Sequence, residues 1–244
     1  MNKIAYMIMQ GKGGCGKSEI AAAHANHLHM TGGGQIIDTD PLNRTLSHYR
    51  ALNVTGLDIM SEASIDPRKF DALMQMLVED PRHAVIDNGA ACFLPLADYL
   101  TQSFAINYLA DNGVQLVLVV PLIGGHDYHD TLNGLTSLAE AMPESRLIVW
   151  KNLHFGPVDF NPADTTFADR IVGIHTMHNR DSSTFGKDRA RIRELGLTWT
   201  EAMVHPEFKG IAGYRLKMVT QELFAQMDGT HRRLAGDKAG EVAA

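Results

Sequence analysis

The sequence is poor in features that would place it in several specialised classes. Its 244 residues include only two cysteines, Cys15 and Cys92, which lie far apart and fit neither a disulfide framework nor the paired spacing of a zinc site. The longest apolar run, residues 114–123, has about half of the ~20 residues that a membrane helix needs. The apolar stretch 4–9 is too short for a signal peptide. We therefore expect a cytoplasmic chain without a membrane span.

An excess of positive charge is also missing. The net charge is −6, so the molecule as a whole does not attract nucleic acid, and any such contact needs a local basic patch. One candidate patch alternates along a predicted helix and consists of Lys187, Arg189, Arg191 and Arg193. Alternate positions spread around a helix, which favours a solvated face with intramolecular pairs over a DNA-binding surface.

The composition and patterning are those of a globular α/β protein. Apolar residues make up 45% and charged residues 20%, and the length suits one large domain. Short continuous apolar runs alternate with longer helical patterns, which is typical of βαβ units. We predict an α/β fold with a doubly wound, mostly parallel sheet and helices on both faces. The predicted strands cover residues 4–9, 35–38, 84–87, 114–121, 147–152 and 171–177, and the predicted helices cover 17–30, 68–78, 94–109, 130–141, 184–195 and 206–227.

The end of the sequence differs in composition from the rest. Residues 228–244 are rich in glycine, alanine and charge, and chain ends of this kind tend to fray. We therefore expect a single domain over residues 1–228 and a flexible tail over residues 229–244.

A glycine-rich segment after the first predicted strand carries the chemistry. Residues 11–18 match the pattern GxxxxGK[ST] between a strand and a helix, as a phosphate-binding loop (P-loop) requires. Glycines let backbone amides wrap a phosphate, Lys17 reaches the β- and γ-phosphates, and Ser18 offers a hydroxyl to Mg²⁺. The pattern predicts a nucleoside triphosphate site with Mg²⁺. Its nucleotide-binding residues are expected to be Gly11, Lys12, Gly13, Gly14, Cys15, Gly16, Lys17 and Ser18.

Acidic residues follow the second and third predicted strands, at the sheet edge where ligands bind in doubly wound folds. Asp38 either serves Mg²⁺ through water or caps the turn that leads to Asp40. Asp87 ends an apolar strand, as in a Walker B motif, and is expected to hold the water shell of Mg²⁺, while the Gly89 amide can approach the γ-phosphate. The predicted metal site comprises Ser18, Asp38, Asp40 and Asp87, partly through water.

A second lysine stands at the start of the loop. Lys12 cannot comfortably reach the phosphates of its own subunit while Lys17 occupies them, so we expect it to point outward. The segment KGGCGKS resembles the deviant Walker A signature, KGGxGK[ST], of the ParA/MinD P-loop ATPases, which belong to the SIMIBI class. This resemblance implies an ATP-sandwich homodimer in which Lys12 reaches the nucleotide of the facing subunit. It also implies that Asp40 orients or activates the attacking water.

The same resemblance bears on recognition of the base. An asparagine in the position of Asn152, at the end of the predicted strand 147–152, reads the adenine edge in that family. A helix or turn cap is an equal alternative for this residue. The family often places a proline against the base after its next strand, whereas this chain has Met177 and His178 there.

Longer segments give a more specific resemblance. They are QGKGGCGKS, IIDTDPLNRTLSHYRALNV, VIDNGAACFLPLADYL, VWKNLHFGP and GYRLKMVTQELFAQMD, and together they resemble the TraL family of conjugal transfer proteins of broad-host-range plasmids. The resemblance spans nearly the whole chain. It implies an Mg²⁺-dependent ATP switch that hydrolyses ATP slowly, dimerises on ATP and serves plasmid conjugation alongside proteins of the transfer machinery. The catalytic residues would be Lys12, Lys17 and Asp40.

Three other functions fit some of the same residues. A DNA-binding partition or stability ATPase would use the 187–193 basic run, and a small-molecule kinase or ligase would use the P-loop for another acceptor. A redox or metal-delivering relative would need more clustered thiolates than two cysteines supply. We interpret Cys15 as a small side chain that fills space in the loop. The histidine pairs at 24 and 27, 126 and 129, and 175 and 178 lack the further ligands that zinc needs.

Overall fold

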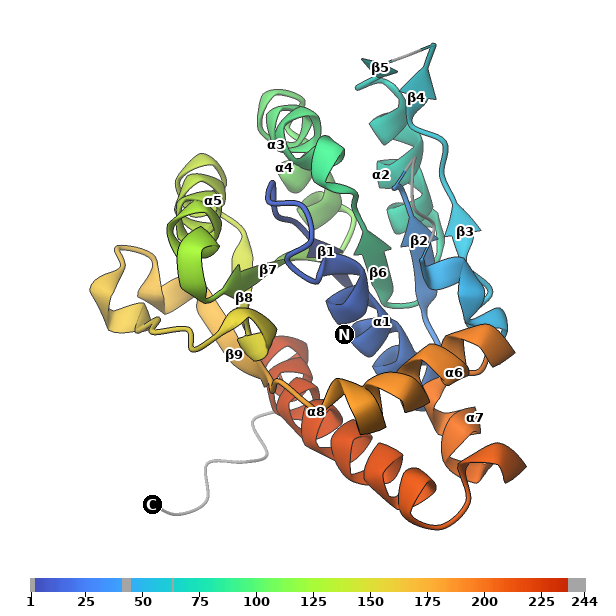
Figure 1. The fold of residues 1–244 in the computed structure, drawn as a ribbon. Coiled ribbons are helices and arrows are strands. Elements are labelled where there is room, and N and C mark those ends of the chain that lie inside the picture. The colour runs from blue at the N-terminus through green and yellow to red at the C-terminus, as the bar shows by residue number, and fades with distance from the viewer. Residues whose placement is uncertain (1–2, 41–44, 63, 237–244) are drawn as a thin grey trace.

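The computed structural model describes residues 3–40, 45–62 and 64–236. Its centre is a seven-stranded sheet in which every neighbouring pair is parallel, with the order β3-β2-β6-β1-β7-β8-β9 (Figure 1). The chain therefore builds the sheet outward on both sides of β1, as in a doubly wound fold. The strands are β1 (Lys3–Ile8), β2 (Gln35–Asp38), β3 (Thr55–Gly56), β6 (Ala84–Asp87), β7 (Val114–Ile123), β8 (Arg146–Asn152) and β9 (Ile171–Met177).

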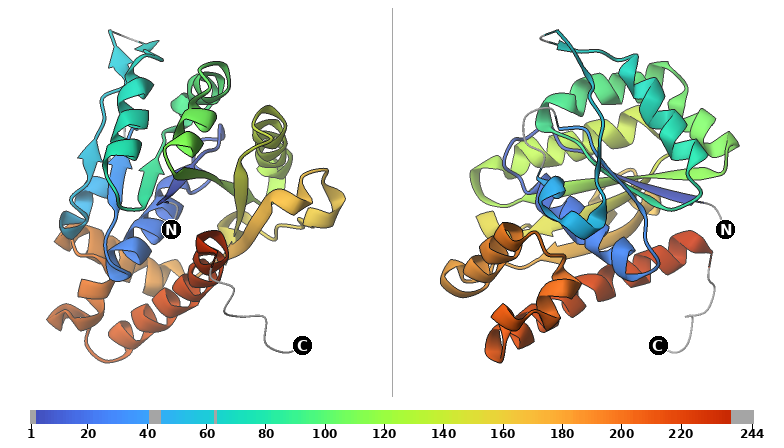
Figure 2. Two further views of the ribbon diagram at one scale, coloured as in Figure 1. Left: turned by 180° about the vertical axis from the view of Figure 1, so that it is seen from behind. Right: turned by 90° about the vertical axis from the view of Figure 1, so that its right-hand side faces the viewer.

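Helices cover both faces of the sheet, which gives three layers (Figure 2). One face carries α2 (Lys69–Glu79), α3 (Phe93–Gln102), α4 (Ala105–Asp111) and α5 (Tyr128–Ala141). The opposite face carries α1 (Lys17–Met30), α6 (Lys187–Leu195), α7 (Trp199–Val204) and α8 (Ile211–Ala235). The predicted fold class, a doubly wound parallel α/β sheet, is confirmed.

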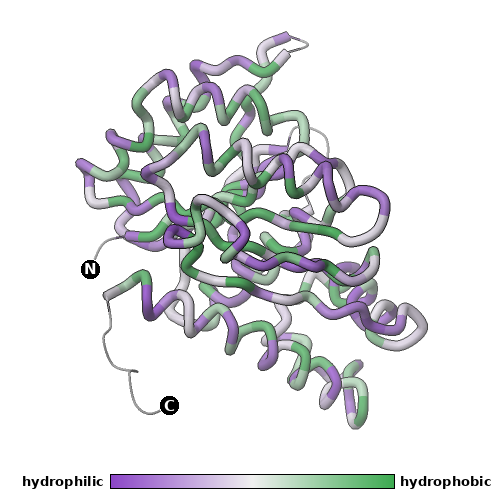
Figure 3. The backbone as a smooth tube through the Cα atoms, turned by 90° about the vertical axis from the view of Figure 1, so that its left-hand side faces the viewer, coloured by the Kyte–Doolittle hydropathy of each residue, from purple (hydrophilic) through white to green (hydrophobic). Residues whose placement is uncertain are grey.

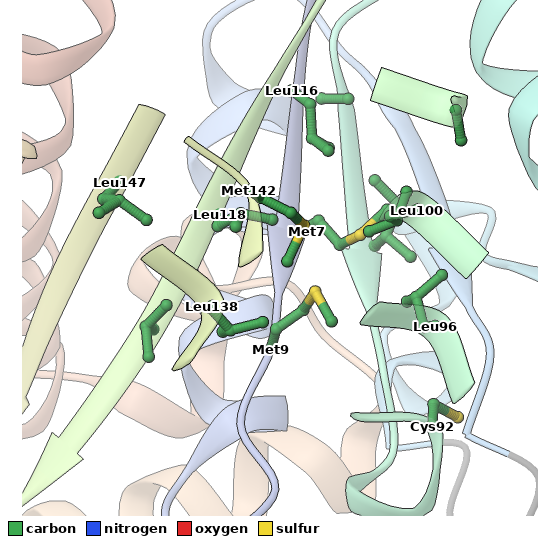
Figure 4. Close-up of a cluster of buried hydrophobic side chains, with 14 of the residues drawn as sticks. Met7, Met9, Cys92, Leu96, Leu100, Leu116, Leu118, Leu138, Met142 and Leu147 are labelled. Atoms are coloured by element: carbon green, nitrogen blue, oxygen red, sulfur yellow. The ribbon is translucent and has the colours of Figure 1, made fainter. Parts of the chain in front are cut away.

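Two separate cores lie on the two sides of the sheet because alternate strand residues face opposite layers. On β1, Ile4 and Tyr6 pack toward α1 and α8, whereas Met7 packs toward α3 and α5. Figure 4 shows the second of these cores, where Met7 lies near Leu100 of α3. The helices at the surface alternate between hydrophilic and hydrophobic stretches (Figure 3). The central strands β1, β2 and β6 are buried at every residue. This is the pattern expected of strands buried on both faces.

All six predicted strands are present, but the prediction missed several short elements. These are β3, the antiparallel pair β4 (Met60–Ser61) and β5 (Ser64–Ile65), and α7. The single helix predicted over residues 94–109 is wrong, because α3 ends before Ser103 and α4 starts after Phe104. Phe104 takes a left-handed conformation with φ 53°, although no glycine or proline marks a break there. Pairing with distant residues and tertiary packing, rather than local composition, set these boundaries.

The tail predicted to begin at residue 229 is wrong for residues 229–235, because α8 continues to Ala235. The polar residues of this last part have partners in the body of the protein. The Thr230 hydroxyl lies 2.9 Å from His175 Nε2, and His231 Nδ1 lies 2.7 Å from the Tyr6 hydroxyl. Residues 237–244 lie outside the described residues. No helix in the described part of the chain is long and apolar enough to cross a membrane.

Candidate nucleotide-binding site

The glycine-rich loop lies at the carboxyl edge of the sheet, between β1 and α1. In the sheet register Ile8 stands beside Asp87, and Asp87 stands beside Asp38, so three strand ends meet next to the loop. Thr39 ties these ends together, since its hydroxyl donates to Asn88 Oδ1 over 2.8 Å. Asn88 Nδ2 in turn donates to the Ile8 carbonyl over 3.0 Å. No local pattern in the sequence predicts this buried polar link, because only the sheet register brings its members together.

Gln10 fixes the entry to the loop, a role that its place in the sequence does not predict. Its Oε1 accepts a hydrogen bond from the Gly11 amide at 2.9 Å, and its Nε2 donates to the carbonyls of Pro121 and Thr131. A Cβ atom at Gly134 would lie only 2.3 Å from Gln10 Oε1, so α5 needs a glycine there to make room. The loop is thus anchored to β7 and α5 before it turns.

The turn itself depends on glycines with positive φ. Gly14 has φ 72° and Gly16 has φ 97°, which are values that favour glycine. A Cβ atom at Gly16 would also lie 2.5 Å from Asn152 Nδ2, so the site lacks space for a side chain there. The Ile20 amide donates to the Gly16 carbonyl over 3.0 Å, which marks the start of α1. The amides at this helix N-terminus supply the positive potential that a phosphate needs.

Lys17 is folded back over the loop. Only 8% of the residue is exposed, and its Nζ donates to the Lys12 carbonyl over 3.0 Å. Nζ also lies 3.9 Å from Cys15 Sγ. The ammonium group is therefore held inside the loop, at the position from which a P-loop lysine contacts the terminal phosphates.

Asp87 is buried beneath the loop, with 1% exposure. Burial raises the pKa of its carboxyl group to about 7, against the opposing effect of the Ser18 hydroxyl, and the charges of Asp38 and Asp40 raise it further. The contact with Ser18 falls outside standard hydrogen-bond geometry, so neither Asp87 oxygen has a well-formed hydrogen bond within the described residues. Buried polar groups normally have partners, so this carboxylate has free acceptor atoms with which a cation or a donor could interact.

Asp38 and Asp40 complete the acidic edge. Asp38 Oδ1 accepts a hydrogen bond from the Asp40 amide at 3.0 Å, so the predicted turn cap is present. Asp40 packs against Gly89, where an added Cβ atom would lie 2.8 Å from Asp40 Cγ. The segments after β2 and β6 are therefore in direct contact. Residues 41–44, which belong to the quoted segment IIDTDPLNRTLSHYRALNV, lie outside the described residues.

These oxygens suit Mg²⁺ better than other metals. Ser18, Asp38, Asp40 and Asp87 are hard oxygen ligands, and the incomplete hydrogen bonding of Asp87 leaves donor atoms for a cation. Within the described residues, no three or more His, Cys, Asp or Glu side chains form a metal cage. Asp38, Asp40 and Asp87 therefore do not form one three-carboxylate cage. Mg²⁺ is usually held by one or two carboxylates together with phosphate and water, and Ser18 with Asp87 would fit that smaller ligand set.

Two cavities meet over the loop and share Gly14, Gly16 and Glu19. The first, of about 470 Å³, is lined by Lys17 and Asp40 among others and lies at the phosphate end. The second, of about 350 Å³, is lined on the far side of the loop by side chains that can enclose a base. These are Asn152, His154, Phe155, Met177, His178 and Phe185.

Asn152 lines the second cavity but also supports the loop. Its Nδ2 donates to the Cys15 carbonyl over 3.0 Å, and its Oδ1 accepts from the His154 amide at 3.2 Å. The predicted cap is therefore present, and the amide group links β8 to the P-loop. Its reading of the adenine edge stays a prediction, as do base contacts of Met177 and His178.

Lys12 points away from Lys17, toward α5. Its Nζ lies 2.8 Å from Asp127 Oδ1 and 3.1 Å from Asp130 Oδ2. These contacts raise the pKa of the Lys12 ammonium group and lower that of the Asp127 carboxyl group. The side chain is 32% exposed, so it lies at the surface of the molecule.

The basic run of α6 does not form one positive face. Arg189 forms an ion pair with Glu19 at the start of α1. Arg191 pairs with Glu194 and Glu207 on another side of the helix. Two of the four basic residues in the run are therefore neutralised by carboxylates of the same molecule. This argues against the run as a DNA-binding patch.

The histidines and cysteines considered for metal binding or redox chemistry are paired with other side chains or buried. His24 accepts a hydrogen bond from Trp150, and His27 pairs with Asp228 at 2.7 Å. Cys15 and Cys92 are both buried, and burial raises the pKa of each thiol, in the case of Cys92 to about 11. Burial therefore disfavours the thiolate form that cluster binding or redox chemistry requires.

The parallel sheet, the glycine loop between β1 and α1, and the acids at the next two strand ends define a doubly wound P-loop fold. The MinD cell division protein of Aquifex aeolicus has this fold, with a TM-score of 0.53 and 17% identity over 96% of this chain and 98% of that one. The MinC:MinD cell division protein complex of the same organism gives 0.52 and 14%, over 98% of each chain. No family model matches the chain.

Relatives with greater sequence identity give the family. Two Escherichia coli proteins, each named Protein TraL, are 37% and 35% identical to this chain over 234 and 232 residues. Each match covers 91% of this chain and 96% of the relative. The chain belongs to the TraL family.

Proposed function

We propose that this protein is an Mg²⁺-dependent ATP switch that hydrolyses ATP slowly in the cytoplasm and serves plasmid conjugation. The observation that carries the proposal is the pairing of two features across one loop. Lys17 is held inside a P-loop with left-handed glycines, and directly beneath it Asp87 is buried without a well-formed hydrogen bond. A polyphosphate and a cation would supply the counter-charges for the lysine and the carboxylate, respectively.

Each residue then has a defined task. Backbone amides of residues 13–18 bind the phosphates, and Lys17 lowers the negative charge on the β- and γ-phosphates. Ser18 and Asp87 would hold Mg²⁺, and the ion would supply positive charge against the negative charge that develops in phosphoryl transfer. Asp40 orients the water whose oxygen bonds to the γ-phosphorus as the bond from that phosphorus to the bridging oxygen breaks. The products are ADP and phosphate.

Dimerisation is the second part of the proposal. Lys12 is at the surface and does not point toward Lys17, which suits a residue that reaches the nucleotide of a facing subunit. It must first leave Asp127 and Asp130, and both pairs are solvent-exposed and therefore weak. Binding of ATP would order the segments after β2 and β6, which already touch through Asp40 and Gly89. Proteins of the transfer machinery would then recognise the closed dimer.

The test measures nucleotide binding and the molar mass of the protein in solution, which reports its oligomeric state. Calorimetric titration with Mg²⁺-ATP is expected to show binding by the wild type and its loss in Lys17→Ala. Light scattering is expected to show an ATP-dependent dimer that accumulates in Asp40→Ala, because hydrolysis no longer releases it. If wild-type protein binds no ATP, the proposed function is wrong. If Asp40→Ala binds ATP but stays monomeric, the switch through dimerisation is wrong.

A further inference from the structure

Helix α6 brings an arginine to the phosphate end of the nucleotide site. Arg193 lines the cavity of about 470 Å³ together with Lys17, Ser18 and Asp40. It does not line the cavity on the Asn152 side of the loop. From the sequence, Arg193 belongs to a basic run for which a solvated face is favoured over a DNA-binding surface. Only the tertiary structure places the end of α6 above the start of α1.

Contacts at both ends of α6 hold this arginine in position. At the first end, Arg189 pairs with Glu19, one residue beyond the Ser18 hydroxyl. At the second end, the Arg50 amide donates to the Gly196 carbonyl over 3.1 Å. Gly196 has φ 69°, and an added Cβ atom would lie 3.0 Å from the His48 carbonyl oxygen, so the helix must end in glycine to pack here.

The charge of Arg193 is not neutralised within the described part of the protein. Arg189 and Arg191 both form ion pairs, whereas Arg193 has no carboxylate partner among the described residues. Arg193 is exposed to solvent at the cavity, and Ile192 beside it is buried and fixes the rotation of the helix. An uncompensated guanidinium group next to a phosphate loop has the charge and planar geometry to bind phosphate oxygens.

We propose that Arg193 is a further cation on the polyphosphate chain, supplied by the same subunit and acting beside Lys17. The inference rests on the proposed function, since it requires a nucleotide in the loop. It assigns Arg193 to the phosphates and not to the base. It also gives α6 a role in the switch, because α6 is joined through Gly196 to the segment that follows Asp40 and includes Arg50.

The test compares two arginines on one helix. Arg193→Gln removes the proposed phosphate contact, and Arg191→Gln is the matched control, because Arg191 pairs with Glu194 and Glu207. Binding of Mg²⁺-ATP, Mg²⁺-ADP and AMP is measured by calorimetry for each purified full-length protein, with circular dichroism to confirm folding. Arg193→Gln is expected to weaken ATP binding about tenfold, which corresponds to about 1.4 kcal/mol, and to leave AMP binding within about twofold. Arg193→Lys, which keeps the charge, is expected to recover part of the loss.

Several outcomes would overturn the inference. ATP affinity unchanged in Arg193→Gln, while Lys17→Ala still loses binding, would exclude Arg193 and leave the proposed function intact. If Arg193→Gln loses as much affinity for AMP as for ATP, Arg193 contacts the nucleoside side and not the polyphosphate. If Arg191→Gln loses as much affinity for ATP as Arg193→Gln does, the effect comes from the net charge of α6 and not from a phosphate contact. Absence of ATP binding by the wild type would instead contradict the proposed function itself.

Discussion

Lys12 and Asp127 form an ion pair of 2.8 Å that holds the outward lysine of the P-loop against α5. The pair joins the loop to a helix that follows it by more than one hundred residues, and Asp130 contacts the same ammonium group at 3.1 Å. In the proposed dimer Lys12 would reach the facing subunit, so its pairs with Asp127 and Asp130 would first have to open.

Removing the acidic partner should favour the dimer. Asp127→Asn is expected to lower the dimer dissociation constant in Mg²⁺-ATP modestly, since a solvent-exposed ion pair is screened by water and salt. Sedimentation velocity measures it, with Glu140→Gln as a control that removes an exposed carboxylate of the same helix. Weaker dimerisation in Asp127→Asn alone would show that Asp127 assists the assembled state instead.

Gly16 should tolerate no side chain, in contrast to Gly13. Gly16→Ala forces a Cβ atom to within 2.5 Å of Asn152 Nδ2 at φ 97°, and a strained residue of this kind costs about 1–3 kcal/mol. A Cβ atom at Gly13 would meet no atom within 4 Å. Urea unfolding of the nucleotide-free proteins is expected to show a loss of stability for Gly16→Ala and little change for Gly13→Ala. Equal midpoints for the two variants would contradict the predicted role of the Gly16–Asn152 contact.

The Asp87 carboxylate is expected to lower the free energy of unfolding of the metal-free protein, while it provides a ligand for Mg²⁺. Its buried carboxylate has no well-formed hydrogen bond within the described residues, and leaving such a group unsatisfied costs about 1–3 kcal/mol. Asp87→Asn is therefore expected to raise the free energy of unfolding of metal-free protein at pH 8 while it removes the Mg²⁺ dependence of ATP binding. The two effects are measured by urea denaturation in chelator and by calorimetry with and without Mg²⁺. A large loss of stability in metal-free Asp87→Asn would show that the carboxylate is already satisfied.

Buried histidines should make the protein sensitive to mild acid. Burial lowers the pKa of His175 to about 4, the positive charge of Arg233 contributes, and burial lowers the pKa of His24 as well. The unfolded chain takes up these protons near pH 6.5, whereas the folded protein does so only at lower pH. The contribution of these histidines to the free energy of unfolding is therefore fully present above about pH 6.5. It is lost as the pH decreases toward 4, and the loss for His175 is ~3 kcal/mol.

Urea unfolding at pH 7.5, 6 and 5 measures this slope. His175→Gln cannot titrate, so its free energy of unfolding should depend less on pH than that of the wild type, whatever its stability at pH 7.5. His29→Gln is the control, because His29 is exposed at the end of α1. Identical slopes for wild type and His175→Gln would show that His175 is not the group responsible.

The sequence alone determined the parts of the protein that depend on neighbouring residues. The continuous apolar runs predicted all six long strands, and GxxxxGK[ST] between a strand and a helix predicted the loop, because both signals are contained in short segments. The sequence also predicted acids at the ends of β2 and β6. These acids share a location because parallel strands have their carboxyl ends at one edge of the sheet. That signal predicts that Asp38, Asp40 and Asp87 lie at the same edge of the sheet.

The tertiary structure alone decided which distant side chains meet. Gln10 holds the loop through carbonyls on β7 and α5, Lys12 finds its acids on α5, and Arg193 reaches the phosphate cavity from α6. The polar end of α8 is helical because buried partners such as His175 satisfy it, although its composition is typical of a frayed tail. These outcomes depend on hydrogen bonds, charges and steric limits between residues far apart in the chain, which no local pattern encodes.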